Sequence, residues 1–393
     1  MKKINKYITF GKPFVGKEEL EILKKVINSK WIGTGPLTKS FEEKFRKFKK
    51  SKYSISVNSC TAAIHLSLIT LGIKDKDEII TTPMTFASTI NAISMVGARP
   101  VLADINKKTF NIDPVNIEKK ITKKTKAILI VHLAGLPCEI NKIKKIAKKH
   151  RLYLIEDCAH SIESMYNNKH TGNFGDMGCF SFYSTKNLTT AEGGMILCKK
   201  KKQSDKIKVL RLHGLAKDAW QRYLPKKAKN VTKFNHYDVK EIGFKYNMTD
   251  LNSALGLAQL KKIRRNWLER KKIFEIYKKK LSHLPIEFQS FKTDVTKFSH
   301  AYHLCIIKLK KNNIRDKLAL YLQKNNIGFG ITYRSVTDMS VFRKKFNWNN
   351  KTCINSKNLG DNSISLPIYP GLSRSDQKLV CTKLNNFFFK YIV

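Results

Sequence analysis

The sequence predicts an α/β protein with a mostly parallel central sheet covered by helices on both faces, followed by a smaller C-terminal α+β domain. Residues 15–200 alternate helix-like and strand-like segments, and the strand-like segments are short apolar runs. Such runs are typical of parallel strands that helices bury on both sides. From residue 286 onward the pattern changes to two strand-like and two helix-like segments, which indicates a separate small domain.

The elements of the large domain follow from the spacing of apolar residues. Helical periodicity predicts helices at residues 18–29, 61–71, 87–96 and 142–149. Short apolar runs predict strands at residues 54–57, 78–80, 100–102, 127–131, 152–155, 180–183 and 195–197.

Residues 212–241 are polar and irregular, which predicts a long loop. Residues 248–279 predict a long helical region that leads to the second domain. There we expect strands at residues 301–307 and 363–366 and helices at residues 313–325 and 375–388. The expected domains are therefore residues 1–260 and residues 261–393.

The composition limits the class of protein. Apolar residues make up 42% of the 393 residues, which is ordinary for a globular chain and argues against disorder. Residues 1–17 lack a continuous apolar segment, so we expect no signal peptide, and no apolar run reaches the ~20 residues that span a bilayer. The eight cysteines are scattered without a C-x-x-C pair, which indicates reduced thiols rather than disulfides or a zinc site. We expect a cytoplasmic protein without membrane insertion and without a metal.

The formal net charge of +46 is unusual. One interpretation is a polyanionic partner such as nucleic acid or an anionic membrane surface. The other is a lysine-rich composition spread over every exposed helix, and we favour it because no single basic arm or stripe is visible in the sequence. We therefore expect no specific nucleic-acid partner, although a positive potential would attract an anionic substrate.

Lys186 stands out because of its setting. The chain has Lys or Arg at 76 positions, so a lysine by itself carries no information. Lys186 follows the strand-like run 180–183 and precedes a Gly-Gly turn, whereas Asp157 ends the strand-like run 152–155. An amine and a carboxylate at the ends of neighbouring strands are what a pyridoxal phosphate (PLP) enzyme requires. The lysine holds the cofactor covalently, and the carboxylate keeps the pyridine nitrogen protonated.

Five motifs occur in a fixed order along most of the chain. They are Trp31–Pro36, Asn58–Ala63, Glu156–His160, Cys179–Leu188 and Gly243–Asp250. Together they resemble the DegT-type nucleotide-sugar aminotransferases, a branch of the fold-type I PLP-dependent transferases. Within that family the chain is most similar to enzymes that aminate C4 of a UDP-linked 4-keto sugar. No motif is decisive alone, but five in order argue strongly against chance.

The resemblance implies catalytic and ring-binding roles for four residues. Lys186 and Asp157 would be the catalytic pair described above. Phe86 would stack on the cofactor ring, where many relatives have Trp. His160 would lie near the ring and its O3′ atom.

The resemblance also implies a phosphate site. Thr61 and Ala62 open a helix, whose first N–H groups and dipole favour an anion. Ser181 would add a hydroxyl, and Asn247 would come from the partner subunit of a homodimer. Cys60 replaces the usual small residue of the family before Thr61, which leaves the details of this loop open.

The substrates are implied in the same way. A nucleotide-linked keto sugar would receive, at C4, the amino group of glutamate, which leaves as 2-oxoglutarate; the product would serve lipopolysaccharide, another surface polysaccharide or a glycan. Thr34, Arg222 and Tyr333 are the candidate substrate-binding residues. Two alternatives stay open: a PLP-dependent sugar dehydratase, in which a histidine replaces the lysine, and a non-catalytic basic nucleic-acid-binding or regulatory protein on the same fold. The presence of Lys186 counts against the first, and the presence of Lys186 and Asp157 counts against the second.

Overall fold

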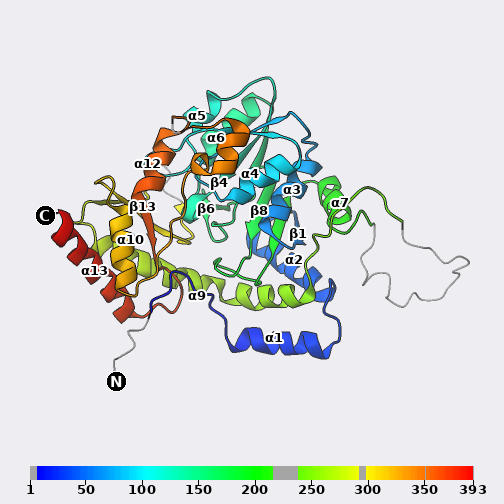
Figure 1. Ribbon diagram of the computed structural model, residues 1–393. Helices are drawn as coiled ribbons and strands as arrows, with labels where there is room; N and C mark the ends of the chain where they lie inside the picture. The colour runs from blue at the N-terminus through cyan, green and yellow to red at the C-terminus, as the bar shows by residue number, and fades with distance from the viewer. Residues whose placement is uncertain (1–6, 216–237, 292–297, 350, 393) are drawn as a thin grey trace, which may run out of the picture.

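The computed structural model describes residues 7–215, 238–291, 298–349 and 351–392, and its core is a seven-stranded sheet (Figure 1). The strand order is β1-β9-β8-β5-β4-β2-β3. Neighbours from β8 to β3 pair in parallel, whereas β9 is antiparallel to both β8 and β1. The mostly parallel sheet is therefore confirmed. The strands are β1 (Tyr53–Val57), β2 (Glu78–Thr81), β3 (Arg99–Leu102), β4 (Thr125–Val131), β5 (Tyr153–Asp157), β8 (Met177–Ser181) and β9 (Gly194–Cys198).

Helices cover both faces of this sheet because successive strand residues point to opposite sides. On β2, Ile79 packs with helices α3, α4 and α7, whereas the next residue, Ile80, packs with α5 and α6. Both residues are fully buried, which explains the continuous apolar runs in the sequence. The helices are α3 (Cys60–Thr70), α4 (Ala87–Met95), α5 (Pro114–Glu118), α6 (Ile140–Lys149) and α7 (Lys201–Leu210).

Helix α9 (Asp250–Lys280) runs without a break between the two parts of the chain. Its first half packs against α1 (Lys17–Asn28) and α2 (Pro36–Lys49). A Cβ atom at Gly256 would lie only 2.6 Å from the ring of Phe41 in α2, so the glycine permits the close approach of these two helices. Its second half joins the C-terminal core. The expected boundary at residue 260 falls inside this helix, and we propose that the division between the domains lies within α9.

The C-terminal part is built on a three-stranded antiparallel sheet in the order β10-β12-β13. Its core also contains Ile8, which forms a bridge with Ile327, so the N-terminal segment crosses from the large domain to the small one. The elements are β10 (Ile286–Phe288), β12 (Cys305–Leu309), α10 (Arg315–Lys324), α11 (Ser340–Phe346), α12 (Ile354–Asn362), β13 (Ser363–Leu366) and α13 (Arg374–Ile392). Three two-residue strands, β6 (Met165–Tyr166), β7 (Lys169–His170) and β11 (Phe298–Ser299), form a third small sheet.

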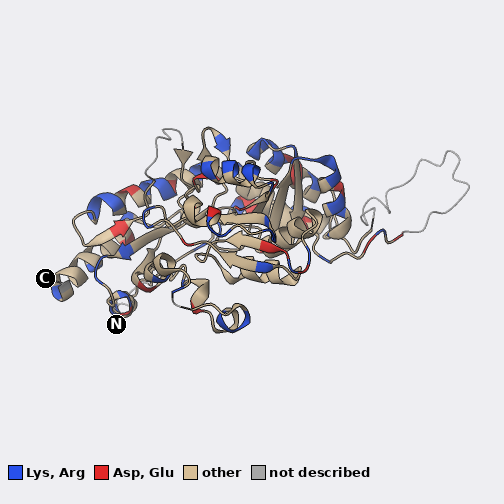
Figure 2. Ribbon diagram, turned by 90° about the horizontal axis from the view of Figure 1, so that it is seen from above, with Lys and Arg blue, Asp and Glu red and all other residues tan. Residues whose placement is uncertain are grey.

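The basic side chains are spread widely. Figure 2 shows Lys and Arg on helices around the molecule and not in a single stripe, which favours the compositional interpretation of the charge. Among the residues described, no helix combines the length and the apolar character needed to cross a bilayer.

Candidate active site

A cavity of about 510 Å³ opens beside the C-terminal ends of β5 and β8. This edge of an α/β sheet is where ligands bind in folds of this class, and the volume is that of a small-molecule site. The cavity brings together most of the residues predicted from the sequence. These are Thr61, Phe86, Asp157, His160, Ser181, Lys186 and Tyr333.

Asp157 is held in a fixed orientation at the end of β5. The carboxylate accepts hydrogen bonds from the Ala159 amide at 3.0 Å and from the Thr89 hydroxyl at 3.2 Å. Burial raises its pKa, while the two hydrogen bonds and the charge of Lys186 act in the opposite direction. A buried carboxylate that needs a positive partner is what a pyridinium nitrogen requires.

Lys186 lies in the turn after β8, where its amide donates to the carbonyl of Tyr183. Burial lowers the pKa of Lys186 to about 8, and the charge of Asp157 partly opposes this shift. An amine with such a pKa has a substantial neutral fraction near physiological pH. It can therefore act as a nucleophile and as a proton carrier.

His160 links the large domain to the small one. Its Nδ1 accepts a hydrogen bond from the Ala134 amide at 3.3 Å, and its Nε2 lies 3.0 Å from the hydroxyl of Tyr333. Burial and the nearby charge of Lys186 hold the pKa of His160 well below its usual range, so the ring is neutral. Because Nδ1 accepts, the single ring proton is on Nε2 and is donated to Tyr333. The Tyr333 hydroxyl keeps its own proton for donation into the cavity.

The N-terminus of α3 faces the same cavity. Ser59 caps the helix, and its hydroxyl accepts from the Ala62 amide at 3.1 Å. That bond engages the Ala62 amide, and the amides of Cys60 and Thr61 remain without a carbonyl partner in the helix. A Cβ atom at Gly194 would lie 2.9 Å from the Cys60 nitrogen, so glycine is required where β9 meets this turn. Free amides and the helix dipole form a site for a phosphate.

Phe86 is exposed over 59% of its surface although it lines the cavity. Its ring centroid lies 6.0 Å from that of Tyr333. A large exposed apolar ring beside a polar cavity is costly unless a ligand covers it, and a flat aromatic ligand would do so by stacking.

Within the described part of the chain, three predicted residues do not line this cavity: Ala62, Asn247 and Thr34. The Asn247 side chain donates to the hydroxyl of Thr34 at 2.6 Å, and that hydroxyl donates to the Met248 carbonyl at 2.6 Å. The Oδ1 atom of Asn247 is buried without a partner among the residues described. Arg222 lies outside the described residues.

The structure adds a chain of buried polar residues behind Lys186 that the sequence did not indicate. The His303 ring lies against that of His160, with centroids 4.4 Å apart, and its Nδ1 contacts the Asn187 side chain at 3.0 Å. The Asn187 amide donates to both oxygens of Glu163, at 3.1 and 2.9 Å. Asn187 follows Lys186 directly, which was the only available signal.

One group with metal-ligating atoms also escaped the sequence reasoning. His132, Glu156 and Cys158 place one ligand atom each within 4.8 Å of one another. The Glu156 carboxylate already accepts from the amides of Gly172 and Gly175, both at 2.8 Å. It also lies 3.1 Å from Nε2 of His132. These hydrogen bonds explain the buried carboxylate as a support for the turn before β8.

The residues of the cavity fit PLP. Lys186 supplies the amine for the covalent link, Asp157 the partner for the ring nitrogen, Phe86 a stacking surface, and the start of α3 with Ser181 a phosphate site. Each part of the cofactor thus has a complementary group in one cavity.

The chain is similar to known proteins along most of its length. Residues 13–385 match the model of the DegT/DnrJ/EryC1/StrS aminotransferase family. The spore coat polysaccharide biosynthesis protein SpsC of Bacillus subtilis is 38% identical over 380 residues, which are 96% of each chain. An uncharacterised protein of Methanocaldococcus jannaschii is 43% identical over 370 residues, 93% of each chain.

Solved structures agree with these relatives. A protein of Streptococcus pneumoniae assigned as a sugar aminotransferase, in its PLP form, superposes with a TM-score of 0.90 at 27% identity. The match covers 99% of this chain and 100% of that one. Helicobacter pylori PseC, an aminotransferase of pseudoaminic acid biosynthesis, gives a TM-score of 0.88 at 29% identity over 98% and 100% of the two chains. The chain therefore belongs to the DegT/DnrJ/EryC1/StrS aminotransferase family, whose members use PLP.

Proposed function

We propose that the protein is a sugar aminotransferase that moves the amino group of glutamate to the keto carbon, C4, of a nucleotide-linked keto sugar. The observation that carries the proposal is the pairing of Lys186 and Asp157 in one cavity of a chain from this family. The sugar class is supported by the relatives, which act in spore coat polysaccharide and pseudoaminic acid biosynthesis. We propose the same setting, the synthesis of a surface polysaccharide or glycan in the cytoplasm.

When bound, PLP supplies an electron sink for the carbanion that forms when the amino donor loses its Cα proton. Lys186 then carries the proton, because its lowered pKa of about 8 lets the amine both take up and release it near neutral pH. Asp157 provides a fixed negative charge on the floor of the cavity. His160 is neutral, and its Nε2–H group donates a hydrogen bond to the hydroxyl of Tyr333.

We propose that the active enzyme is a homodimer with shared sites. In support, Asn247 does not line the cavity of its own subunit, and one N–H of its side-chain amide donates to Thr34. The second N–H of this amide would donate to a phosphate on the neighbouring subunit. The dehydratase alternative is disfavoured by Lys186, and the nucleic-acid alternative by the dispersed charge (Figure 2).

The test is a substrate panel. The PLP-loaded enzyme should be incubated with glutamate and with UDP-, GDP- and dTDP-linked keto sugars, and the products followed by mass. An amino sugar formed only with glutamate present supports the proposal. Loss of water from the sugar without amine transfer would support the dehydratase, and no product with any member would contradict the substrate class.

A further inference from the structure

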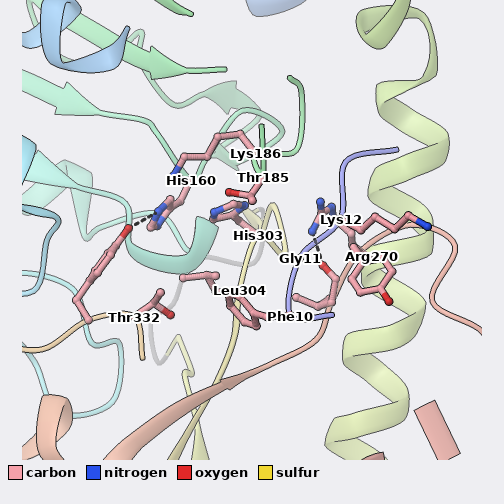
Figure 3. Close-up of a pocket in the computed structure, with 13 residues that line it drawn as sticks. Phe10, Gly11, Lys12, His160, Thr185, Lys186, Arg270, His303, Leu304 and Thr332 are labelled. Carbon is pink, nitrogen blue, oxygen red and sulfur yellow. Dashed lines mark hydrogen bonds between the residues drawn. The ribbon is translucent and has the colours of Figure 1, made fainter. Parts of the chain in front are cut away.

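A second, smaller cavity of about 100 Å³ adjoins the cofactor cavity and shares Lys186, His160 and Tyr333 with it. Its remaining walls come from far apart in the chain: the N-terminal segment at Phe10–Lys12, His303 before β12, and Arg270 of α9. Figure 3 shows Lys186, His160, His303 and Arg270 around this space, with Arg270 entering from the side of α9. None of the steps proposed above involves Phe10–Lys12, His303 or Arg270.

Arg270 is a buried cation without a matching anion. Arg270 is only 4% exposed, and its Nη1 atom donates to the carbonyl of Ile368. Within the described part of the chain, Nε is buried without a partner, Nη2 makes no hydrogen bond, and no carboxylate forms an ion pair with the guanidinium. Burial lowers the pKa of Arg270 to about 10, so the group is still charged at neutral pH. An uncompensated buried charge is strongly unfavourable, and an anion in this cavity would relieve it.

Glu163 is the acidic residue whose charge acts on Arg270, but it is already engaged. Both of its oxygens accept from the Asn187 amide, and burial raises its pKa to about 7. Glu163 therefore carries only a partial negative charge near neutral pH. It orients Asn187 and does not neutralise Arg270.

His303 gives the cavity a hydrogen-bond acceptor. The Asn187 amide group donates to Glu163 and to the Ala301 carbonyl, so its oxygen is the acceptor for His303 Nδ1. Nε2 of His303 is then an unprotonated acceptor. The cavity is thus lined by a cation, a hydrogen-bond acceptor and Lys186. A molecule with a carboxylate and an adjacent N–H group matches this arrangement.

Building on the proposed transamination, we propose that Arg270 binds a carboxylate of the amino donor and so holds an amino acid with its amine beside Lys186. A planar guanidinium suits a carboxylate better than it suits a sugar hydroxyl, because its positive charge and its N–H groups match the two carboxylate oxygens. The cavity would thus be the amino-acid subsite, separate from the surface that takes the sugar nucleotide.

The test uses glutarate, a dicarboxylate without an amine, so binding can be measured where no reaction occurs. Calorimetry and thermal denaturation of the PLP-loaded dimer should compare wild type with Arg270→Met, Arg270→Lys and Arg264→Met. Arg264 is an exposed residue of the same helix, so Arg264→Met controls for the lost charge. We expect glutarate to raise the Tm of wild type and of Arg264→Met. Arg270→Met should weaken binding by at least about tenfold, and Arg270→Lys by less.

A structural role for Arg270 predicts a different result. It would make Arg270→Met less stable in the absence of glutarate and leave the relative effect of glutarate unchanged. We expect instead that Arg270→Met is at least as stable as wild type without glutarate, since an unpaired buried charge is removed. Equal glutarate affinity in wild type and Arg270→Met, equal loss in Arg264→Met, or no binding to wild type would each overturn the proposal.

The outcome is independent of the reaction itself. If glutarate binding depends on Arg270 but the bound cofactor is not converted by glutamate, the subsite stands and the proposed transamination fails. If glutamate converts the cofactor equally in wild type and Arg270→Met, the transamination stands and the subsite fails.

Discussion

The hydroxyl of Tyr333 lies 3.0 Å from Nε2 of His160 and joins the small domain to the loop that follows β5. His160 is held from its other side by the Ala134 amide. The direction of proton donation is therefore set, from His160 to Tyr333. The Tyr333 proton can then be offered only to a group in the cavity.

Tyr333→Phe tests this contact. The change removes the donor and leaves Nε2–H of His160 without its acceptor, so we expect a stability loss of about 1–3 kcal/mol. The half-reaction with the amino donor should slow by about tenfold while PLP content is unchanged. Stopped-flow absorbance of the cofactor and thermal denaturation give both quantities, with Tyr321→Phe on α10 as the control. A wild-type rate in Tyr333→Phe would limit the hydroxyl to a structural role.

Lys186→Ala should lower turnover by about 10²- to 10⁴-fold or more, because the nucleophile and the proton carrier are both removed. The fold should persist, since the side chain makes no hydrogen bond on which β8 depends. Lys202→Ala, at an exposed position near the start of α7, is the matched control. Turnover of Lys186→Ala within a few-fold of wild type would refute its assignment.

The pKa of Lys186 predicts how the apoenzyme captures PLP. Only the neutral amine attacks an aldehyde, and burial lowers its pKa to about 8. The capture rate should therefore rise about tenfold per pH unit below pH 8 and level off above it, whereas an ordinary lysine would show a rise up to pH ~10. The measurement is the absorbance change on mixing apoenzyme with PLP from pH 6 to pH 10. A rate that still increases steeply above pH 9 would contradict the lowered pKa.

Asp157→Asn separates binding from chemistry. The amide is nearly isosteric, so PLP should still bind through the start of α3 and Lys186, but the negative charge is lost. A charge-assisted hydrogen bond is worth roughly 1.5–3 kcal/mol, and about 1.4 kcal/mol corresponds to a factor of ten in rate. We therefore expect the single-turnover half-reaction with glutamate to slow by about ten- to a hundredfold or more. A normal rate at full PLP occupancy would show that Asp157 is only structural.

The shared site can be tested by mixing two inactive proteins. Lys186→Ala and Asn247→Ala, combined under conditions of subunit exchange, should recover part of the activity, because a mixed dimer has one site with both residues intact. Exchange is verified with tagged subunits separated by chromatography. Absence of activity in verified mixed dimers would contradict a contribution of Asn247 across the interface.

The sequence predicted the parts of the site that lie in recognisable local motifs, and Tyr333 of the C-terminal part. Asp157 and Lys186 were found because each follows an apolar strand, and a strand end is readable from the sequence. Arg270 and His303 were missed because they reach the site only when the C-terminal part folds back on the sheet. Among 76 Lys and Arg residues, the sequence also does not distinguish one functional arginine from the others. The buried hydrogen-bonded chain from His303 through Asn187 to Glu163 depends on side-chain rotamers, which the periodicity of the sequence does not show.

The fold is confirmed, whereas the division into domains at residue 260 stays a prediction. Strand alternation and helical spacing are local signals, and they located the strands of the large sheet. The domain division depends instead on which side of α9 each residue packs against. That is a tertiary property, and residue 260 has no breaker such as Gly or Pro to mark it.

The unbroken course of α9 restricts how this enzyme can admit its substrates. Near its first turn, Asp250 holds the 35–38 segment by accepting from the amides of Gly35 and Thr38, at 2.9 and 2.8 Å. Hinge closure of two domains requires a few residues that undergo large changes in backbone dihedral angles. A continuous hydrogen-bonded helix contains no such residues. Because Asp250 and Arg270 lie on the same unbroken helix, the distance between them along its axis stays at about 30 Å. A hinge between the two proposed domains within α9 is therefore disfavoured, which leaves loop and side-chain movements at the rim of the cavity to admit a ligand.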